Sequence, residues 1–259
     1  MNGLNELFGL DGRTAVVTGA SAGLGVEFAE ALAAAGARVA IMARRRERLE
    51  EVAARLRSEY GAEVLPVTVD LNNEEDRRRA FGEVEARLGP VYALVNNAGT
   101  APTGAAERQW PKDWQASLDL NLSALFHCCL LAAESMRGGK EGRIINIASI
   151  FGHLGSSLFR VASYAAAKGG VENLTRQLAV EWAGDGITVN AIAPAWFASE
   201  MTETSLTKEG IRESMGRACP MARIGKAGEL KTACLFLASP SSSYVSGTVV
   251  AVDGGYSAW

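Results

Sequence analysis

The stretch "RTAVVTGASAGLG", Arg13–Gly25, joins an apolar run to a glycine-rich turn and decides the fold. The letters "AVVT" form the continuous β-branched run that is typical of a strand buried on both faces. Glycines stand at 19, 23 and 25, and the helical pattern "GVEFAEALAAAGA" begins at the last of them. A strand, a glycine turn and a helix in this order predict the first unit of an α/β fold with a parallel sheet.

The same alternation of short apolar runs and helical stretches continues along most of the 259 residues. Because crossovers between parallel strands are right-handed, we expect a doubly wound parallel sheet with helices on both faces. The predicted strands are 13–18, 38–43, 63–70, 91–99, 142–149, 187–194 and 247–255, and the main helices are 45–59, 74–88, 113–137 and 162–183.

The sequence shows no repeat and no linker, so residues 1–259 are predicted to form one α/β domain. The least regular part is 195–226, which follows Pro194 and contains Pro220. A long irregular segment beside the carboxyl ends of the strands is typical of a substrate lid, and we interpret it so.

Composition excludes several classes of protein. A net charge of −3 argues against a nucleic-acid binder, which would present a basic face. The four cysteines have no metal-ligand spacing, so we expect no metal site and a reducing compartment. The first residues, "MNGLNELFGLDGR", lack the pattern of a signal peptide, and we see no apolar run that would cross a bilayer. We therefore expect a cytoplasmic protein without nucleic-acid or membrane partners.

The glycine turn suits a dinucleotide. Glycines let the backbone approach a pyrophosphate closely, and the following helix offers free N–H groups and the positive end of its dipole. Two alternatives remain: a turn without a ligand, and the nucleophile elbow G-x-S-x-G of a hydrolase, "GASAG", with Ser21 as nucleophile. Asp119 and His127 or His153 follow in the chain order of a triad. We favour the dinucleotide because the elbow of that hydrolase fold follows several strands, whereas this turn follows the first.

The end of the second predicted strand bears on the choice of cofactor. A carboxylate there would bind the ribose hydroxyls of NAD, but Ala43 is followed by Arg44, Arg45 and Arg46. A guanidinium pairs well with a 2′-phosphate, so NADP(H) is favoured over NAD(H). The alternative is that these arginines are a solvated helix start. Asp70, at the end of the third strand, is placed to accept a hydrogen bond from the adenine amino group.

Tyr164 and Lys168 stand four residues apart in a predicted helix and therefore share one face. An ammonium near a phenol lowers the phenol's pKa, and a shift from about 10 to about 7 corresponds to roughly 4 kcal/mol. Tyr164 is then a candidate general acid or base, and Ser149 a candidate donor to the substrate oxygen. The alternative is an interfacial tyrosine beside a solvated lysine. The small neighbours of Lys168, including Gly169 and Gly170, favour the site because they admit a cofactor.

Together these motifs resemble the short-chain dehydrogenase/reductase family from about Asp11 to Gly255. The matching motifs occur in the family's order: "TGASAGLG", "NNAG" (96–99), Ser149 with Tyr164-x-x-x-Lys168, "NAIAP" (190–194) and "VDGG" (252–255). The resemblance implies an NAD(P)-binding Rossmann fold with seven parallel strands, usually assembled as a homotetramer.

The family's catalytic tetrad falls on Asn121, Ser149, Tyr164 and Lys168. The resemblance implies that Tyr164 exchanges a proton with a ketone or alcohol, that Lys168 holds the nicotinamide ribose, and that Asn121 holds a water for proton relay. It also implies that Phe197 and Ser199 bind the carboxamide. The full predicted cofactor set is Gly19, Ser21, Gly23, Leu24, Gly25, Arg44, Arg45, Asp70, Leu71, Asn97, Ala98, Gly99, Tyr164, Lys168, Pro194, Phe197 and Ser199.

Three departures from the family pattern stand out. The Ser149–Tyr164 spacing is two residues longer than usual, which puts the shape of the substrate pocket in doubt. Ala195 and Ser199 replace the usual glycine and threonine, and Ala22 replaces the basic residue often found in the glycine turn. The last difference weakens the argument for NADP.

The substrate pocket is predicted to be mostly apolar, with Phe151, Leu154, Phe159, Trp196 and Met201. We therefore expect a neutral ketone or secondary alcohol as the small-molecule substrate. Within the family the chain looks most like gluconate 5-dehydrogenases and 3-oxoacyl-carrier-protein reductases, so a sugar acid or an acyl thioester is the alternative. A non-catalytic cofactor-binding module would be expected to have a broken tetrad, and all four residues are present.

Overall fold

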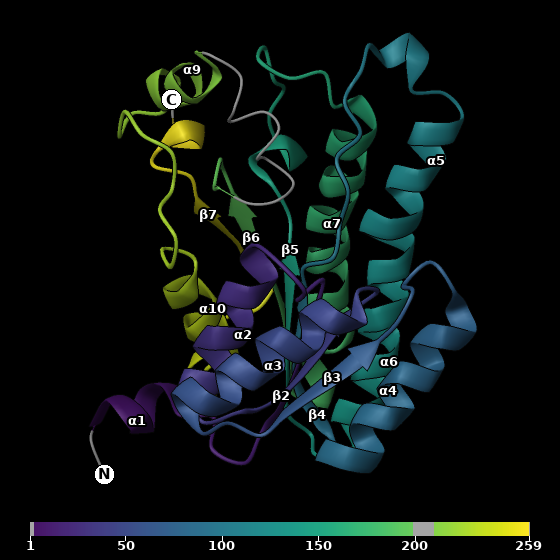
Figure 1. Cartoon of the computed structure of the whole chain (residues 1–259), viewed down its shortest axis with the longest axis vertical. Coiled ribbons are helices and arrows are strands. Elements are labelled where there is room, and N and C mark those ends of the chain that lie inside the picture. The colour runs from purple at the N-terminus through teal and green to yellow at the C-terminus, as the bar shows by residue number, and fades with distance from the viewer. Residues whose placement is uncertain (1–2, 199–209, 259) are drawn as a thin grey trace.

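The computed structural model describes residues 3–198 and 210–258, and within them seven parallel strands form one sheet (Figure 1). The strand order β3-β2-β1-β4-β5-β6-β7 confirms the predicted α/β class and the doubly wound arrangement. The strands are β1 (Thr14–Thr18), β2 (Arg38–Ala43), β3 (Val64–Thr68), β4 (Val91–Asn96), β5 (Gly142–Ile147), β6 (Ile187–Pro194) and β7 (Val249–Val252).

Helices cover both faces of the sheet and create two apolar layers (Figure 1). One layer is formed by α2 (Leu24–Ala34), α3 (Arg46–Tyr60) and α10 (Lys231–Ala238), and the other by α4 (Glu74–Leu88), α5 (Lys112–Leu118), α6 (Leu125–Arg137) and α7 (Ala162–Glu181). The sequence analysis did not identify α10 or the short N-terminal helix α1 (Gly3–Phe8). Another short helix, α9 (Ile211–Arg217), lies in the segment that we predicted to be a lid.

Strand β4 ends earlier than predicted, at Asn96 instead of residue 99. The reason is a change of hydrogen-bond partner: the backbone N–H groups of Asn97 and Ala98 both donate to the Thr18 hydroxyl, at 3.0 and 3.1 Å. The chain therefore leaves the sheet and crosses over the end of β1, where it forms one wall of a groove.

The predicted helix 113–137 contains a π-helical segment, η2 (Asp119–Ala124), between α5 and α6. Within it the Asn121 side-chain amide donates to the Ser117 carbonyl at 2.9 Å, the acceptor that the backbone of a regular α-helix would use. The whole helix, Lys112–Arg137, is by length and composition apolar enough to span a membrane, whereas the sequence analysis saw no such apolar run. Its α6 part packs against β4 and β5 as a core helix of the domain.

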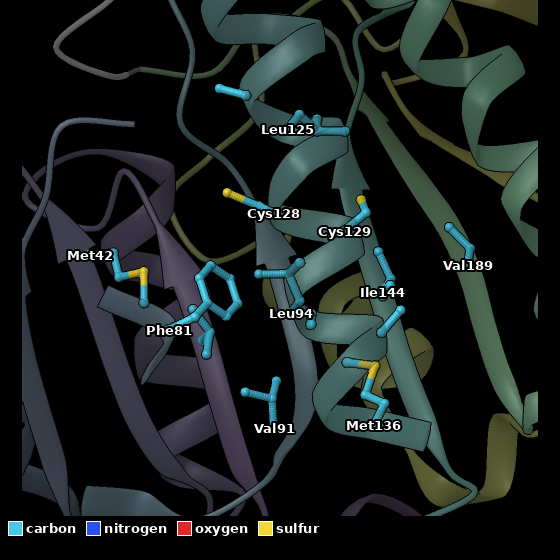
Figure 2. Packing of buried hydrophobic residues seen from close by; sticks show 14 of the residues in the cluster. Met42, Phe81, Val91, Leu94, Leu125, Cys128, Cys129, Met136, Ile144 and Val189 are labelled. Atoms are coloured by element: carbon cyan, nitrogen blue, oxygen red, sulfur yellow. The ribbon is translucent and has the colours of Figure 1, made fainter. Parts of the chain in front are cut away.

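Three buried thiols lie in the two apolar layers. Figure 2 shows Cys128 on the Phe81 side of α6 and Cys129 on the Ile144 side. Burial raises the pKa of Cys128 to about 12, and it also raises the pKa of Cys129. Cys234, on α10, likewise has its pKa raised to about 12 by burial. The folded protein therefore keeps these thiols neutral at a pH where the unfolded chain ionises them.

This difference predicts a loss of stability in alkali. Each thiol stabilises the fold fully below the unfolded pKa of 9.0, and each loses about 1.4 kcal/mol per pH unit above it. We expect the free energy of unfolding, measured with urea in reducing buffer, to fall between about pH 8 and about pH 10. In the triple variant Cys128→Ala, Cys129→Ala and Cys234→Ala the slope should be clearly smaller. The difference between the two proteins isolates the thiols, and equal slopes would contradict their role.

Candidate active site

A groove of about 520 Å³ opens at the carboxyl ends of the strands, where the strand order reverses between β1 and β4. This is the position at which open α/β sheets bind ligands, and the volume suits a cofactor-sized molecule. Of the predicted catalytic and cofactor residues, those that line it are Gly19, Ser21, Gly23, Leu24, Arg44, Arg45, Asp70, Leu71, Asn97, Ala98, Gly99, Ser149, Tyr164, Lys168, Pro194 and Phe197. Ser199 and Met201 lie outside the described residues.

The glycine turn at the end of β1 needs its glycines for two different reasons. Gly19 and Gly23 have φ angles of +67° and +59°, in the left-handed region that side chains disfavour. Gly25 does not line the groove; a Cβ there would lie 2.4 Å from the Gly19 carbonyl oxygen and 2.6 Å from the Asn97 amide nitrogen. Gly25 therefore allows the turn to pack tightly, and the other two shape its path.

The side chain of Asn97 ties the two central strands together at the groove. Its amide nitrogen donates to the carbonyls of Thr18 at 3.0 Å and Gly19 at 3.2 Å. The side chain thus lies in the wall as predicted, but its donor groups are used to hold the glycine turn. Any contact that Asn97 makes with a ligand comes from its remaining surface.

A positively charged region lies at the end of β2. Arg45 donates to the hydroxyl of Ser21 through Nε at 3.3 Å and Nη2 at 3.1 Å, and Arg44 lines the groove beside it. Helix α3 begins at the next residue, so both guanidinium groups lie near the positive end of its dipole. Asp70 faces the groove from the end of β3 and accepts from the backbone N–H of Asn72 at 3.0 Å. A bound anion would relieve the repulsion between these arginines and the helix.

Tyr164, Lys168 and Ser149 meet at the other end of the groove. The Lys168 side chain is 3% exposed, its Nζ donates to the Ile147 carbonyl at 2.6 Å, and it lies 5.6 Å from the centre of the Tyr164 ring. Burial lowers the pKa of Lys168 to about 8. The Ser149 hydroxyl is hydrogen-bonded to the Tyr164 phenol and accepts from the backbone N–H of Phe151 at 3.2 Å.

The prediction that Lys168 lowers the pKa of Tyr164 is wrong for this structure. Enclosure in the groove wall raises the pKa of Tyr164 above its usual value, and the hydrogen bond with Ser149 offsets only part of the rise. The Lys168 ammonium donates to the Ile147 carbonyl, and its own lowered pKa of about 8 means that it loses its charge just above neutral pH. The phenol therefore keeps its proton at neutral pH.

Asn121 lies behind the site and is 0% exposed. Its side chain clamps the backbone of Thr100, accepting from the N–H at 3.0 Å and donating to the carbonyl at 2.8 Å. A Cβ at Gly99 would lie 2.6 Å from the Asn121 oxygen and 3.8 Å from Lys168 Nζ, so only glycine fits between them. The amide of Asn121 is thus fully engaged in the fold, and it holds the groove wall next to Lys168.

The predicted pocket residues Phe151, Leu154, Phe159 and Trp196 do come together, but in a small apolar cluster next to Ser149 and not in the groove itself. The sequence analysis missed Tyr256, whose ring meets Trp196 edge-on with centroids 4.8 Å apart. It also missed Thr100 and Leu120, which line the groove. Thr100 directly follows the motif NNAG, and Leu120 directly precedes Asn121. These neighbours in the sequence were the signal that could have identified the two residues.

The contacts of Ser21 and of the histidines do not form a hydrolase triad. Ser21 accepts hydrogen bonds from Arg45. His127 accepts one from Arg77 at 2.8 Å on the α4–α6 side, and His153 is hydrogen-bonded to Glu172 at 2.7 Å. Within the described ranges, no hydrogen bond joins either histidine to Ser21.

One groove combines a dinucleotide-type turn, a basic end and a Ser–Tyr–Lys cluster. Together these features define a nucleotide-binding oxidoreductase of the α/β class. A family model described as enoyl-(acyl carrier protein) reductase matches residues 19–257. The chain is 38% identical to galactitol 2-dehydrogenase (L-tagatose-forming) of Cereibacter sphaeroides over 98% of each chain. It is 35% identical to gluconate 5-dehydrogenase of Gluconobacter oxydans over 96% of each chain.

Solved structures agree with these relatives. A gluconate 5-dehydrogenase from Burkholderia cenocepacia in complex with NADP and tartrate superposes with a TM-score of 0.93 at 35% identity, over 99% of both chains. The protein belongs to the short-chain dehydrogenase/reductase family, and it is an oxidoreductase.

Proposed function

We propose that the protein interconverts a neutral secondary alcohol and its ketone with NADP(H), using Tyr164 to transfer the proton. The observation that carries the proposal is the cluster in which the Tyr164 phenol is hydrogen-bonded to Ser149 beside the buried Lys168. The nicotinamide, when bound, supplies or accepts the hydride. The remaining work, binding the substrate oxygen and moving its proton, falls to these side chains.

Each side chain has a separate task at the substrate oxygen. Ser149 donates a hydrogen bond to that oxygen and stabilises the charge that develops there. Tyr164 gives its proton to the oxygen in reduction and takes it back in oxidation. Lys168 holds the cofactor's nicotinamide-side ribose, and Asn121 keeps the wall behind it in place. Because burial raises the pKa of Tyr164, the phenol is protonated at neutral pH, which is the form that donates the proton in reduction.

The fit to a dinucleotide is supported by the shape and charge of the groove. Gly19 and Gly23 give the turn its left-handed backbone without a side chain of their own, and α2 begins directly after it. Arg44 and Arg45 supply the charge that a 2′-phosphate needs at the adenosine end. Three of the similar solved structures hold bound NADP, which is in keeping with this assignment.

The substrate is proposed to be neutral. In the part of the chain that the structure describes, the cations lining the groove are Lys168 and, at the adenosine end, Arg44 and Arg45. The cluster next to Ser149 is apolar. Galactitol, after which the galactitol 2-dehydrogenase with 38% sequence identity is named, is a neutral polyol. We therefore favour polyols and their ketoses over sugar acids as substrates.

A 3-oxoacyl-carrier-protein reductase is the second candidate in the family, and it needs free cations for an acidic partner. Arg137 is paired with Asp185 at 2.8 Å, and Arg176 lies 3.6 Å from Glu172. Because these two arginines are already paired with carboxylates, we favour polyol oxidation and reduction over reduction of a carrier-protein thioester.

We also propose that the protein is a cytoplasmic homotetramer. Phe126 and Leu130 on α6 and Val180 on α7 expose apolar side chains on the outer face of the helical layer. Burial of such side chains against a second copy is the usual fate of an apolar helix face.

Substitution of the proposed acid tests the mechanism. Tyr164→Phe keeps the ring but removes the proton, so turnover should fall at least about 100-fold. NADPH affinity, measured by fluorescence, should stay close to that of the wild type. Tyr244→Phe, at a fully exposed tyrosine, is the matched control. Equal turnover in the two variants would reject the assigned role.

The substrate class is decided by measuring turnover with galactitol, L-tagatose, gluconate and an acetoacetyl thioester. We expect the highest kcat/KM for the polyol and ketose pair. A higher value for gluconate or for the thioester would contradict the neutral-substrate proposal.

Cofactor choice is tested by the double variant Arg44→Ala and Arg45→Ala. Loss of two charge-assisted contacts should weaken NADPH binding about 10- to 100-fold and leave NADH binding nearly unchanged. Arg48→Ala is the matched control, because Arg48 is an exposed α3 residue paired with Glu51. If the wild type binds NADH more tightly than NADPH, the assignment of NADP(H) is wrong.

A further inference from the structure

Helix α7, which carries Tyr164 and Lys168, has no cap of its own. Its N-cap residue, Val161, makes no side-chain hydrogen bond to the helix, and the first turn contains no acidic residue. The first hydrogen bond inside the helix runs from the Ala165 N–H to the Val161 carbonyl at 2.8 Å. The N–H of Ser163 therefore needs an acceptor from elsewhere, because the first N–H groups of a helix have no partner inside it.

Gln109 supplies that acceptor from 54 residues away. Its Oε1 accepts from the Ser163 backbone N–H at 3.0 Å, and the residue is only 2% exposed. Among the described residues the Ser163 hydroxyl has no hydrogen-bond partner, so it offers the helix no local cap. The position of the first turn of α7 thus depends on a side chain in a different segment.

The other end of the same amide fixes two loops. Gln109 Nε2 donates to the carbonyls of Gly104 at 2.7 Å and Arg160 at 3.3 Å. The Gly104 N–H also donates to the Arg160 carbonyl, at 2.9 Å. The Gln109 main chain is held as well, since its carbonyl accepts from the N–H of Trp114 in α5 at 2.8 Å. One side-chain amide therefore joins the loop after β4, the loop before α7 and the start of α7.

We propose that Gln109 is a positioning residue for the reaction: it fixes the first turn of α7 so that the Tyr164 phenol meets Ser149. Ser163, the residue that Gln109 holds, directly precedes Tyr164 in the chain. A shift of the phenol by about 1 Å is enough to cost a large part of a catalytic rate. The inference rests on the proposed role of Tyr164 as the proton donor.

The chemistry of the three contacts explains why glutamine suits this position. An acceptor is needed for Ser163 and a donor for the two carbonyls, and a planar amide offers both. Gln109→Met has a similar shape but leaves the Ser163 N–H and the Gly104 carbonyl without this partner, while the Arg160 carbonyl keeps its bond from the Gly104 N–H. Gln109→Glu keeps the acceptor for Ser163, and because burial beside two carbonyl oxygens favours the neutral carboxyl, its O–H can still donate to the Gly104 carbonyl.

The test compares Gln109→Met and Gln109→Glu with Gln115→Met as a matched control. Gln115 is exposed, and within residues 3–198 and 210–258 its side chain bonds only to Asp119, one turn further along. Three quantities are measured: kcat with KM for the substrate, NADPH affinity, and hydrogen exchange of the backbone around Ser163. In Gln109→Met we expect kcat to fall about 10- to 100-fold, NADPH affinity to change less than about threefold, and the Ser163 amide to exchange faster. In Gln109→Glu we expect both kcat and Ser163 protection to be largely kept.

The inference is overturned if Gln109→Met matches Gln115→Met in kcat, or if its Ser163 amide remains protected. If Gln109→Met does not fold, Gln109→Glu decides: retention of kcat and of Ser163 protection supports the inference, and loss of kcat with protection kept overturns it. Hydrogen exchange of the Ser163 amide reports whether Gln109 caps α7, and this measurement does not require turnover. A wild-type protein that turned over none of the candidate substrates would therefore reject the proposed function and still show whether Gln109 caps α7.

Discussion

The hydrogen bond from Lys168 Nζ to the Ile147 carbonyl is the contact on which the site depends. It joins α7 to the last residue of β5, and Ser149 follows two residues later in the chain. Because the lysine is 3% exposed, its ammonium has to find a partner inside the protein, and the strand end provides one. This contact places Tyr164, one helical turn earlier, against Ser149 at the edge of the groove.

Small residues allow α7 to come close to the turn after β5 and to η2. A Cβ at Gly169 would lie 3.0 Å from the Gly152 carbonyl oxygen, and one at Gly170 would lie 2.9 Å from the Leu122 side chain. Glycine at 152 is needed too, since a Cβ there would lie 2.6 Å from the buried Glu172 carboxylate. The three glycines thus let α7, the turn after β5 and η2 pack closely, and the reactive groups are held by rigid elements.

The sequence predicted well what depends on local pattern: the alternation of strands and helices, the glycine turn, and the shared helix face of Tyr164 and Lys168. It did not predict features that come from contacts between distant segments. The π-helical segment arises because the Asn121 side chain takes a backbone acceptor, and β4 ends early because Thr18 captures two N–H groups. The raised pKa of Tyr164 reflects enclosure, which no spacing rule measures. Gln109 belongs to no motif, and its importance is visible only in its three partners.

A titration of Lys168 tests the central contact most directly. Lysine labelled with ¹³C at Cε would be followed by NMR as a function of pH in the protein without cofactor, and the resonance assigned by its disappearance in Lys168→Met. The buried, carbonyl-bound ammonium predicts one lysine that titrates near pH 8, well below the usual value of 10.5. If every lysine titrates above about pH 10, Lys168 is solvated, and the described arrangement of the site is wrong.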